Sequence, residues 1–359
     1  MLFRKKKKDF EIEIVEVPEE EEIEALCLSE EDDEAEEKVL LAEVYEMKRN
    51  TFPSSDCDTD ISYYVFAPKR VKPRAIIQLV HGFCDHTLRY QYLAELLCRE
   101  GFILCGGDHV GHGYTAENRD ELGFTVSGGG SAYIVKDTHR LTRIIKREYP
   151  DLPVILLGQG MGSVIARLYM RHYDRDIFAA VLVGTDGGAI NARLCKKLSQ
   201  IVISERGERE RCELLSKFAF IKYNKKFKKE KSPYSWLTSD EEQREEWEDD
   251  GLCAFVPTAR MMYDTFDMLL AANRDEWTDK IEKDLPVLII SGECDPFGDY
   301  GKGVRALYRK MKRAGVRDIT LRLYNDGRHE LLFEKNKEVV VKNTLDWIED
   351  RLEERINEA

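Results

Sequence analysis

Short apolar segments alternate with longer segments of helical periodicity along most of this chain, and this alternation restricts its fold more than any other feature. Candidate strands lie at 75–80, 102–105, 154–157, 178–183, 287–290 and 319–324. Candidate helices lie at 90–100, 135–147, 163–173, 303–314 and 339–351. Strands that alternate with helices build parallel sheets that are covered on both faces. We therefore predict an α/β fold with a mostly parallel sheet and helices on both faces.

The same pattern divides the chain into four parts. Residues 1–40 are an acidic low-complexity extension, and residues 41–189 hold the first part of the α/β core. Residues 190–265 interrupt the alternation with segments that are rich in Lys, Arg and aromatic residues at helical spacing, and the core resumes over 266–359. We predict that the insertion is a helical cap over the carboxyl edge of the sheet, where open α/β sheets place their ligands.

The acidic charge of the chain is concentrated in the extension. The whole chain has 55 Lys and Arg against 68 Asp and Glu, and residues 1–37 alone hold sixteen acidic and five basic residues. The rest of the chain is nearly neutral, which argues against a nucleic-acid partner. Residues 11–17 alternate like a strand with Ile12 and Ile14 on one face, but the acidic runs favour a solvated tail.

Cysteine usage and the N-terminal composition predict a cytoplasmic protein. The nine cysteines are an odd number without any C-x-x-C pair, which argues against a disulfide framework or a zinc finger. The basic residues 4–8 are not followed by an apolar stretch, so no signal peptide is expected, and no apolar run reaches the length of a membrane span. The basic cluster leaves peripheral contact with anionic lipid open. No metal and no cofactor are expected.

Four polar or glycine-rich segments each follow a predicted strand, where a parallel sheet gathers its functional loops. They are His81-Gly82-Phe83-Cys84-Asp85-His86; Asp108-His109-Val110-Gly111-His112-Gly113; Gly158-Gln159-Gly160-Met161-Gly162-Ser163; and the late pair Gly292-Glu293-Cys294-Asp295 and Gly327-Arg328-His329-Glu330. In this order the segments resemble the α/β-hydrolase superfamily. More narrowly, they resemble the group of monoacylglycerol lipases, lysophospholipases and serine aminopeptidases, over about residues 50–355.

The resemblance places a nucleophile elbow at residues 158–162. In this family a strand-to-helix turn of the form G-x-S-x-G lifts a serine above the sheet, and Gly158 and Gly162 occupy the flanking positions. The family usually has G-H-S-M-G, whereas this chain has Gln159 and Gly160 at the two central positions. Gly160 therefore stands at the nucleophile position. Glycine adopts the elbow backbone freely, whereas another residue there is strained by about 1–3 kcal/mol.

The resemblance also implies the other parts of a hydrolase site. Asp295 would be the acid and His329 the base, in the chain order that this fold uses. The backbone N–H groups of Phe83 and Met161 would form the oxyanion hole. The implied ligand is a small acyl ester or lipid-like molecule under the cap, with monoacylglycerols or lysophospholipids as the substrate class.

Several neighbouring residues have alternative interpretations. We expect His81, His109 and His112 to support their turns rather than to act in catalysis, and Asp108 to organise its loop. Asp299 competes with Asp295 for the position of the acid. Ser163 and Cys84 are the candidates for a replacement nucleophile. We expect Ser163 to be a buried helix residue, and Cys84 would need a nearby base to become a thiolate.

Two functions follow from these expectations. The first is hydrolysis of carboxylic esters, impaired by the glycine at position 160. The second is a non-catalytic role, in which the chain binds an acyl ligand or a protein partner.

Overall fold

The computed structural model describes residues 12–16, 44–188 and 191–358. Most of the extension predicted at 1–40, including the basic cluster at 4–8, lies outside the described residues. The described residues form one mixed sheet of nine strands in the order β1-β9-β8-β7-β6-β4-β5-β3-β2. The strands are β1 (Ile12–Val15), β2 (Tyr45–Pro53), β3 (Asp60–Pro68), β4 (Ala75–Val80), β5 (Phe102–Gly107), β6 (Val154–Gln159), β7 (Ala179–Val183), β8 (Val287–Gly292) and β9 (Ile319–Tyr324).

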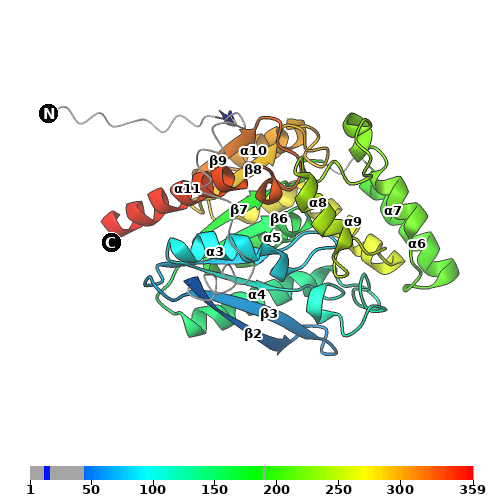
Figure 1. Ribbon diagram of the computed structural model, residues 1–359, viewed down its shortest axis with the longest axis horizontal. Coiled ribbons are helices and arrows are strands. Elements are labelled where there is room, and N and C mark those ends of the chain that lie inside the picture. The colour runs from blue at the N-terminus through cyan, green and yellow to red at the C-terminus, as the bar shows by residue number, and fades with distance from the viewer. Residues whose placement is uncertain (1–11, 17–43, 189–190, 359) are drawn as a thin grey trace.

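Helices cover both faces of this sheet (Figure 1). They are α3 (Gln91–Arg99), α4 (Ser131–Glu148), α5 (Met161–Tyr173), α6 (Ala192–Arg206), α7 (Glu213–Phe220), α8 (Glu241–Asp249), α9 (Ala259–Ala272), α10 (Lys302–Arg313) and α11 (Lys337–Glu358). Successive strand residues point to opposite faces, so Ile76 belongs to the hydrophobic cluster that includes residues of α4, α5 and α10, whereas Ile77 belongs to the cluster that includes residues of α3 and α11. The predicted α/β fold with a mostly parallel sheet is confirmed.

Two strands at the sheet margin were not predicted. β2 and β3 form an antiparallel pair, and β3 also pairs antiparallel with β5. The remaining pairs between neighbouring strands, from β5 through β9 to β1, are parallel. The antiparallel pair makes the sheet mixed at one end and leaves its centre parallel.

The expectation of a solvated N-terminal tail is wrong for residues 12–15. These residues form β1, which pairs in parallel with β9 at the sheet edge. Ile12 packs against the hydrophobic core, and Glu13 forms an ion pair with Arg322 of β9. The strand-like alternation of this segment agrees with β1, in which Ile12 is partly buried whereas Ile14 is 58% exposed.

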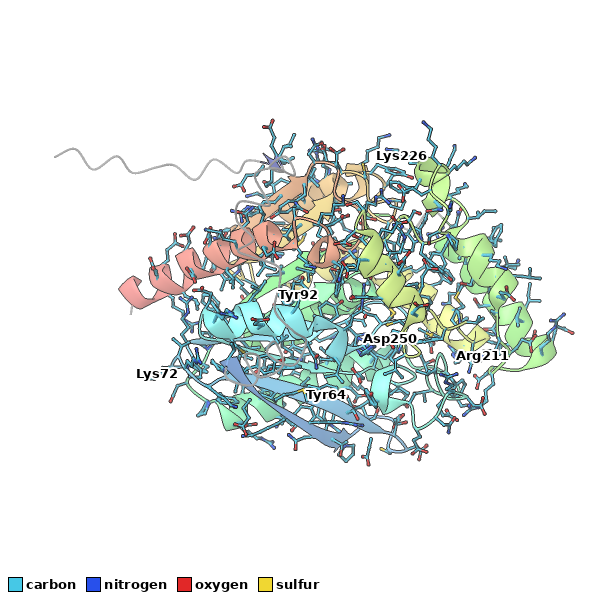
Figure 2. The ribbon with its side chains drawn as sticks, viewed as in Figure 1. Tyr64, Lys72, Tyr92, Arg211, Lys226 and Asp250 are labelled. Atoms are coloured by element: carbon cyan, nitrogen blue, oxygen red, sulfur yellow. The ribbon has the colours of Figure 1, made fainter. Side chains whose placement is uncertain are left out.

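Four helices, α6 to α9, lie between β7 and β8, in the region of the predicted cap. In Figure 1 α6 and α7 stand at the end of the molecule opposite the C-terminus. α9 packs on α6 and also on α5 of the core, and the predicted boundary at residue 265 falls inside it. Figure 2 labels Lys226 in the cap and Tyr64 on β3, on opposite sides of the molecule. The division into core and cap stays a prediction.

Candidate active site

The sharp turn between β6 and α5 is built from glycines. Gly160 lies between the two elements with φ 55° and ψ −115°, a backbone conformation that other residues adopt only with strain. A Cβ atom on Gly162 would lie 1.8 Å from the carbonyl oxygen of Val80, and one on Gly158 would lie 2.4 Å from the carbonyl oxygen of Gly162. The close approach of β6, α5 and β4 therefore requires glycine at both flanking positions, as the elbow motif predicts.

Two loops from the carboxyl ends of β8 and β9 bring Asp295 and His329 together beside this turn. Nδ1 of His329 lies 3.1 Å from Oδ2 and 3.2 Å from Oδ1 of Asp295, and both side chains are buried. Asp295 also accepts a hydrogen bond of 2.8 Å from the backbone N–H of Phe297, which fixes its carboxylate. Burial lowers the pKa of His329, but the negative charge and hydrogen bond of Asp295 outweigh burial and raise it above its ordinary value.

The free nitrogen of this imidazole faces Gly160. The hydrogen bonds of the His329 ring to the described residues are made by Nδ1, and Nε2 makes none. The side chain of Gln159, which stands where the family has histidine, donates a hydrogen bond of 3.2 Å to the backbone carbonyl of His329. Gln159 thus ties the elbow to the loop that carries the base.

The two candidates for a replacement nucleophile have other contacts. The hydroxyl of Ser163 is fully buried and donates a hydrogen bond of 2.6 Å to the carbonyl oxygen of Gly160. Cys84 lines the cavity described below, but its thiol lies 3.5 Å from the carbonyl oxygen of Phe255. Burial and the nearby carboxylate of Asp85 raise the pKa of the Cys84 thiol well above its ordinary value, so the reactive thiolate is disfavoured.

The competing acid Asp299 is exposed, and the Nδ1 atom of His329 bonds to Asp295 instead. Asp108 accepts hydrogen bonds from the backbone N–H groups of Thr87 and Tyr114, which are the contacts of a loop organiser. The interpretation of Asp295 as the candidate acid and of Asp108 as a loop organiser agrees with the order of the segments along the chain.

The three histidines at 81, 109 and 112 pack against one another beneath the loop that follows β4. Nε2 of His81 accepts a hydrogen bond of 3.0 Å from the backbone N–H of His109, and its Nδ1 lies 3.0 Å from the carbonyl oxygen of Gly82. Burial lowers the pKa of His81 and His109 well below the ordinary value and that of His112 to about 4. These imidazoles are therefore neutral at physiological pH and support the turns.

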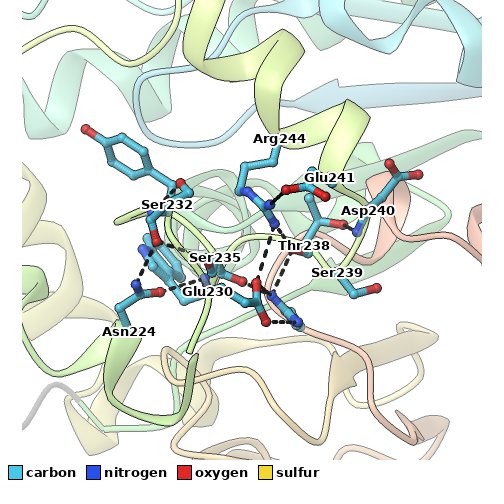
Figure 3. A network of polar contacts seen from close by, with 12 residues as sticks. Asn224, Glu230, Ser232, Ser235, Thr238, Ser239, Asp240, Glu241 and Arg244 are labelled. Carbon is cyan, nitrogen blue, oxygen red and sulfur yellow. Dashed lines mark hydrogen bonds and ion pairs between the residues drawn. The ribbon is translucent and has the colours of Figure 1, made fainter. Parts of the chain in front are cut away.

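A polar network joins the cap to the loop that carries His329 (Figure 3). Glu230 forms a two-pronged ion pair with the guanidinium of Arg328, at 2.7 and 2.9 Å, and lies 3.6 Å from Arg244. The backbone N–H of Glu330 donates to the carbonyl oxygen of Leu237 in the cap, at 2.7 Å. Both neighbours of His329 in the chain are thus anchored to cap residues.

A cavity of about 570 Å³ opens beside Gly160 and His329. Phe83 and Met161, the expected oxyanion residues, line it together with Gln159, while the cap supplies an aromatic wall. That wall includes Phe220, Tyr223 and Trp236. The ring centroids of Trp236 and Phe297 lie 5.0 and 5.2 Å from the centroid of the His329 ring. The sequence indicated a cap rich in aromatic residues but did not indicate which rings face this histidine.

A buried ion pair beside the site was also missed. The guanidinium of Arg89 binds both carboxylate oxygens of Glu330, at 2.7 and 3.0 Å, and lies 3.6 Å from the carboxylate of Asp85. The pair joins segments 241 residues apart in the chain. Glu330 belongs to one of the four polar segments, but Arg89 belongs to none of them, so the sequence did not indicate that the two residues meet.

Solved structures share this architecture. A carboxyl esterase from Bacillus coagulans, solved in complex with glycerol, aligns with a TM-score of 0.80 at 28% identity, over 85% of this chain and 99% of that one. A soluble variant of monoglyceride lipase from Saccharomyces cerevisiae, in complex with a substrate analogue, aligns with a TM-score of 0.67 at 19% identity, over 86% and 96% of the two chains. Sheet, elbow and neighbours define an α/β-hydrolase.

The family follows from the sequence. The profile of the serine aminopeptidase family, S33, matches residues 71–336, and the chain belongs to this family. A monoacylglycerol lipase of Mycolicibacterium smegmatis is 33% identical over 132 residues, which are 37% of this chain and 44% of that protein. Human monoglyceride lipase is 34% identical over 103 residues, 27% and 30% of the two chains. The matches thus span less than half the length of these relatives.

Proposed function

We propose that this chain binds a single-chain acyl ester or related lipid under its cap and hydrolyses it poorly. The observation that carries the proposal is the Asp295–His329 pair, whose free nitrogen faces Gly160 where the family has serine. Under this proposal Phe83 and Met161 supply the oxyanion N–H groups, and the elbow residues Gly158, Gln159 and Gly162 shape the turn. The class of reaction is that of the family, the hydrolysis of carboxylic esters.

The cavity supports an acyl ligand. Its volume of about 570 Å³ lies within the range of about 300–1,000 Å³ that is usual for small-molecule sites. Its wall is mainly aromatic and aliphatic. Polar groups, among them those of His329, Gln159 and Asn224, interrupt this apolar wall at a few positions. Several relatives are named monoacylglycerol or monoglyceride lipases, and a glycerol monoester fits both the apolar wall and the polar groups.

The glycine at position 160 accounts for the proposed impairment. Without a side chain nucleophile no acyl-enzyme forms, and what remains is binding together with the oxyanion hole. In serine proteases that lack a triad member, the remaining rate acceleration over the reaction in water is about 10³–10⁴-fold. Because the cavity is open rather than filled, the non-catalytic alternative that the structure favours is binding of an acyl ligand, ahead of a scaffold role.

The first test of the proposal asks for a reactive serine. A fluorophosphonate probe should leave the purified protein unlabelled, whereas stoichiometric labelling at any serine would overturn the proposed impairment. Labelling at Ser163 would identify a displaced nucleophile.

The second test asks for the ligand. Binding of 1-oleoylglycerol, followed by calorimetry, should be lost in Ala219→Trp, because residue 219 lines the cavity. The matched control is Ala306→Trp on the exposed face of α10, which should bind as the parent does. Equal binding by the two variants would show that the cavity does not hold the lipid.

A further inference from the structure

Three metal-ligating side chains from two distant segments meet beside the cavity. His86 lies in the loop after β4, and Asp250 and Cys253 lie between α8 and α9 in the cap region. One ligand atom from each lies within 4.8 Å of the other two, and Nε2 of His86 is 2.7 Å from Oδ2 of Asp250. Figure 2 shows Asp250 where the cap helices approach the core.

A tight turn holds the two ligands of the cap on one side. The backbone N–H of Cys253 donates to the carbonyl oxygen of Asp250 at 2.9 Å, and the N–H of Leu252 donates to its Oδ1 at 2.8 Å. The spacing, D-x-x-C, matches that of the C-x-x-C turns whose two ligands grip zinc in structural sites. The expectation of no metal was based on the absence of any C-x-x-C pair, and His86 is 164 residues from Asp250, so no local spacing indicates this cluster.

The surroundings of these residues carry an excess of buried negative charge. Arg89 is shared by Glu330 and Asp85, and Asp108 accepts hydrogen bonds from neutral backbone donors. All three carboxylates are buried. A cation bound between His86 and Asp250 would offset this negative charge, because an uncompensated buried charge is strongly unfavourable.

The ring of His86 supplies a second observation. The side chain is 5% exposed, and its Nδ1 atom has no hydrogen-bond partner among the described residues. Nε2 of the ring contacts Asp250, so Nδ1 is the buried polar atom that the described residues leave without a partner.

An ion can reach Asp250 and Cys253 from solvent. A hollow of about 550 Å³ opens at the surface and is lined by Asp250 and Cys253, with Arg119, Arg211 and Glu248 also on its wall. The site therefore has ligands, compensating charge and access, which are the features that a metal site needs.

We propose that His86, Asp250 and Cys253 bind a divalent transition metal of the zinc type. One nitrogen, one carboxylate and one sulfur ligand suit zinc rather than magnesium or calcium, and a water would take the fourth position of a tetrahedral site. The metal would join the cap to the loop that contains Phe83, the proposed oxyanion residue three positions before His86. It would thereby hold the cap and one wall of the cavity in a fixed relation.

Cobalt(II) tests this proposal because its thiolate complexes absorb in the near ultraviolet. The metal-free full chain should bind one equivalent with a thiolate-to-cobalt charge-transfer band, and zinc should displace it. Cys253→Ser should lose the band, and His86→Gln and Asp250→Asn should each weaken binding by at least the about tenfold that the loss of an outer-sphere partner costs. Cys212→Ser, which removes another buried cysteine of the cap, is the matched control and should bind as the parent does.

A band that survives in Cys253→Ser at parental strength would overturn the proposal. So would equal cobalt affinity of the parent and Asp250→Asn, which retains the size of the side chain and serves if Cys253→Ser does not fold. Either result would show that His86, Asp250 and Cys253 do not bind the metal together. Circular dichroism of each variant establishes that the fold is retained.

Discussion

Nε2 of His329 lies 2.9 Å from the point that a Cβ atom on Gly160 would occupy. A side chain at position 160 would therefore touch the imidazole that Asp295 orients from the other side. This arrangement of elbow, imidazole and carboxylate matches the order of groups in a serine hydrolase, with the hydroxyl left out.

Gly160→Ser should generate measurable hydrolysis of p-nitrophenyl butyrate. The new hydroxyl would stand beside a base that is already held by Asp295, and Gly160→Ser combined with Gln159→His should be at least as active. Adding His329→Ala should abolish the gain, because no group would then accept the serine proton. If Gly160→Ser folds and remains as inactive as the parent, the oxyanion groups and the base are not positioned for catalysis.

The same substitution should lower the free energy of unfolding by about 1–3 kcal/mol, because a Cβ atom at φ 55° is strained and crowds His329. Gly160→Ala carries the same Cβ atom without the hydroxyl, so it should be destabilised to the same degree and show no activity. Urea denaturation measures both. A Gly160→Ala variant as stable as the parent would show that the elbow accepts a side chain without strain.

The charge of Asp295 should be visible in the titration of His329. Asp295 raises the pKa of this imidazole above its ordinary value of about 6.5 although burial acts in the opposite direction. In Asp295→Asn the largest raising contribution is lost and burial is opposed mainly by the charge of Glu330, so the pKa of His329 should fall relative to the parent. Histidine NMR of the parent and the variant, with His329→Gln for assignment, measures the change; an unaltered pKa would contradict the coupling.

The activity of Gly160→Ser should follow the same titration. The base must be neutral to accept a proton, so kcat/KM should rise with pH, with a midpoint above about 6.5. A pH–rate profile with p-nitrophenyl butyrate gives the midpoint. Activity that falls over this range as pH rises would exclude His329 as the base.

Arg89→Met should lower the free energy of unfolding by about 3–5 kcal/mol, because it leaves the buried carboxylates of Glu330 and Asp85 without their cation. Arg89→Met combined with Glu330→Leu removes one of the stranded charges and should recover part of the loss. Chemical denaturation of both single variants and the double variant forms a cycle. Strict additivity in this cycle would show that the pair is not coupled.

Ile12→Asp should destabilise the protein by about 1–2 kcal/mol, since Ile12 packs against the core. Ile14→Asp introduces the same charge on the same strand at an exposed position and should have little effect. Thermal unfolding compares the two. Equal melting temperatures for both variants would show that β1 does not contribute to stability through its packing.

The central sheet was predictable because its strands, such as β4 and β8, are fully buried apolar runs bounded by turn residues. β2 was missed because its side chains are mostly exposed and mostly polar or charged, and β3 because Ser62 and two tyrosines interrupt its apolar run. β1 was assigned to a solvated tail because acidic composition was weighted above four residues of strand pattern. Its ion pair with Arg322 joins residues more than 300 positions apart, and local composition cannot predict such a contact.

The candidate site was predictable to the level of motif order, and its elbow turn has the backbone that the glycines imply. The contact of Arg89 with Glu330 and the ring of Trp236 beside His329 were not, because each joins segments that have no fixed spacing in sequence. Asp295 could be placed because it follows a strand of the parallel sheet, and such loops lie at the carboxyl edge of the sheet. Cap residues do not follow a strand, so their positions could not be predicted in this way.

The pairing of β1 with β9 has a consequence for self-association. Without those four residues β9 would be the outermost strand of the sheet, with a row of unpaired N–H and C=O groups that another chain could extend. β1 covers that row and is itself only four residues long, and the exposed Glu13 within it and Glu16 directly after it make it a poor template for a further strand. The N-terminal segment thus protects the sheet from edge-to-edge aggregation.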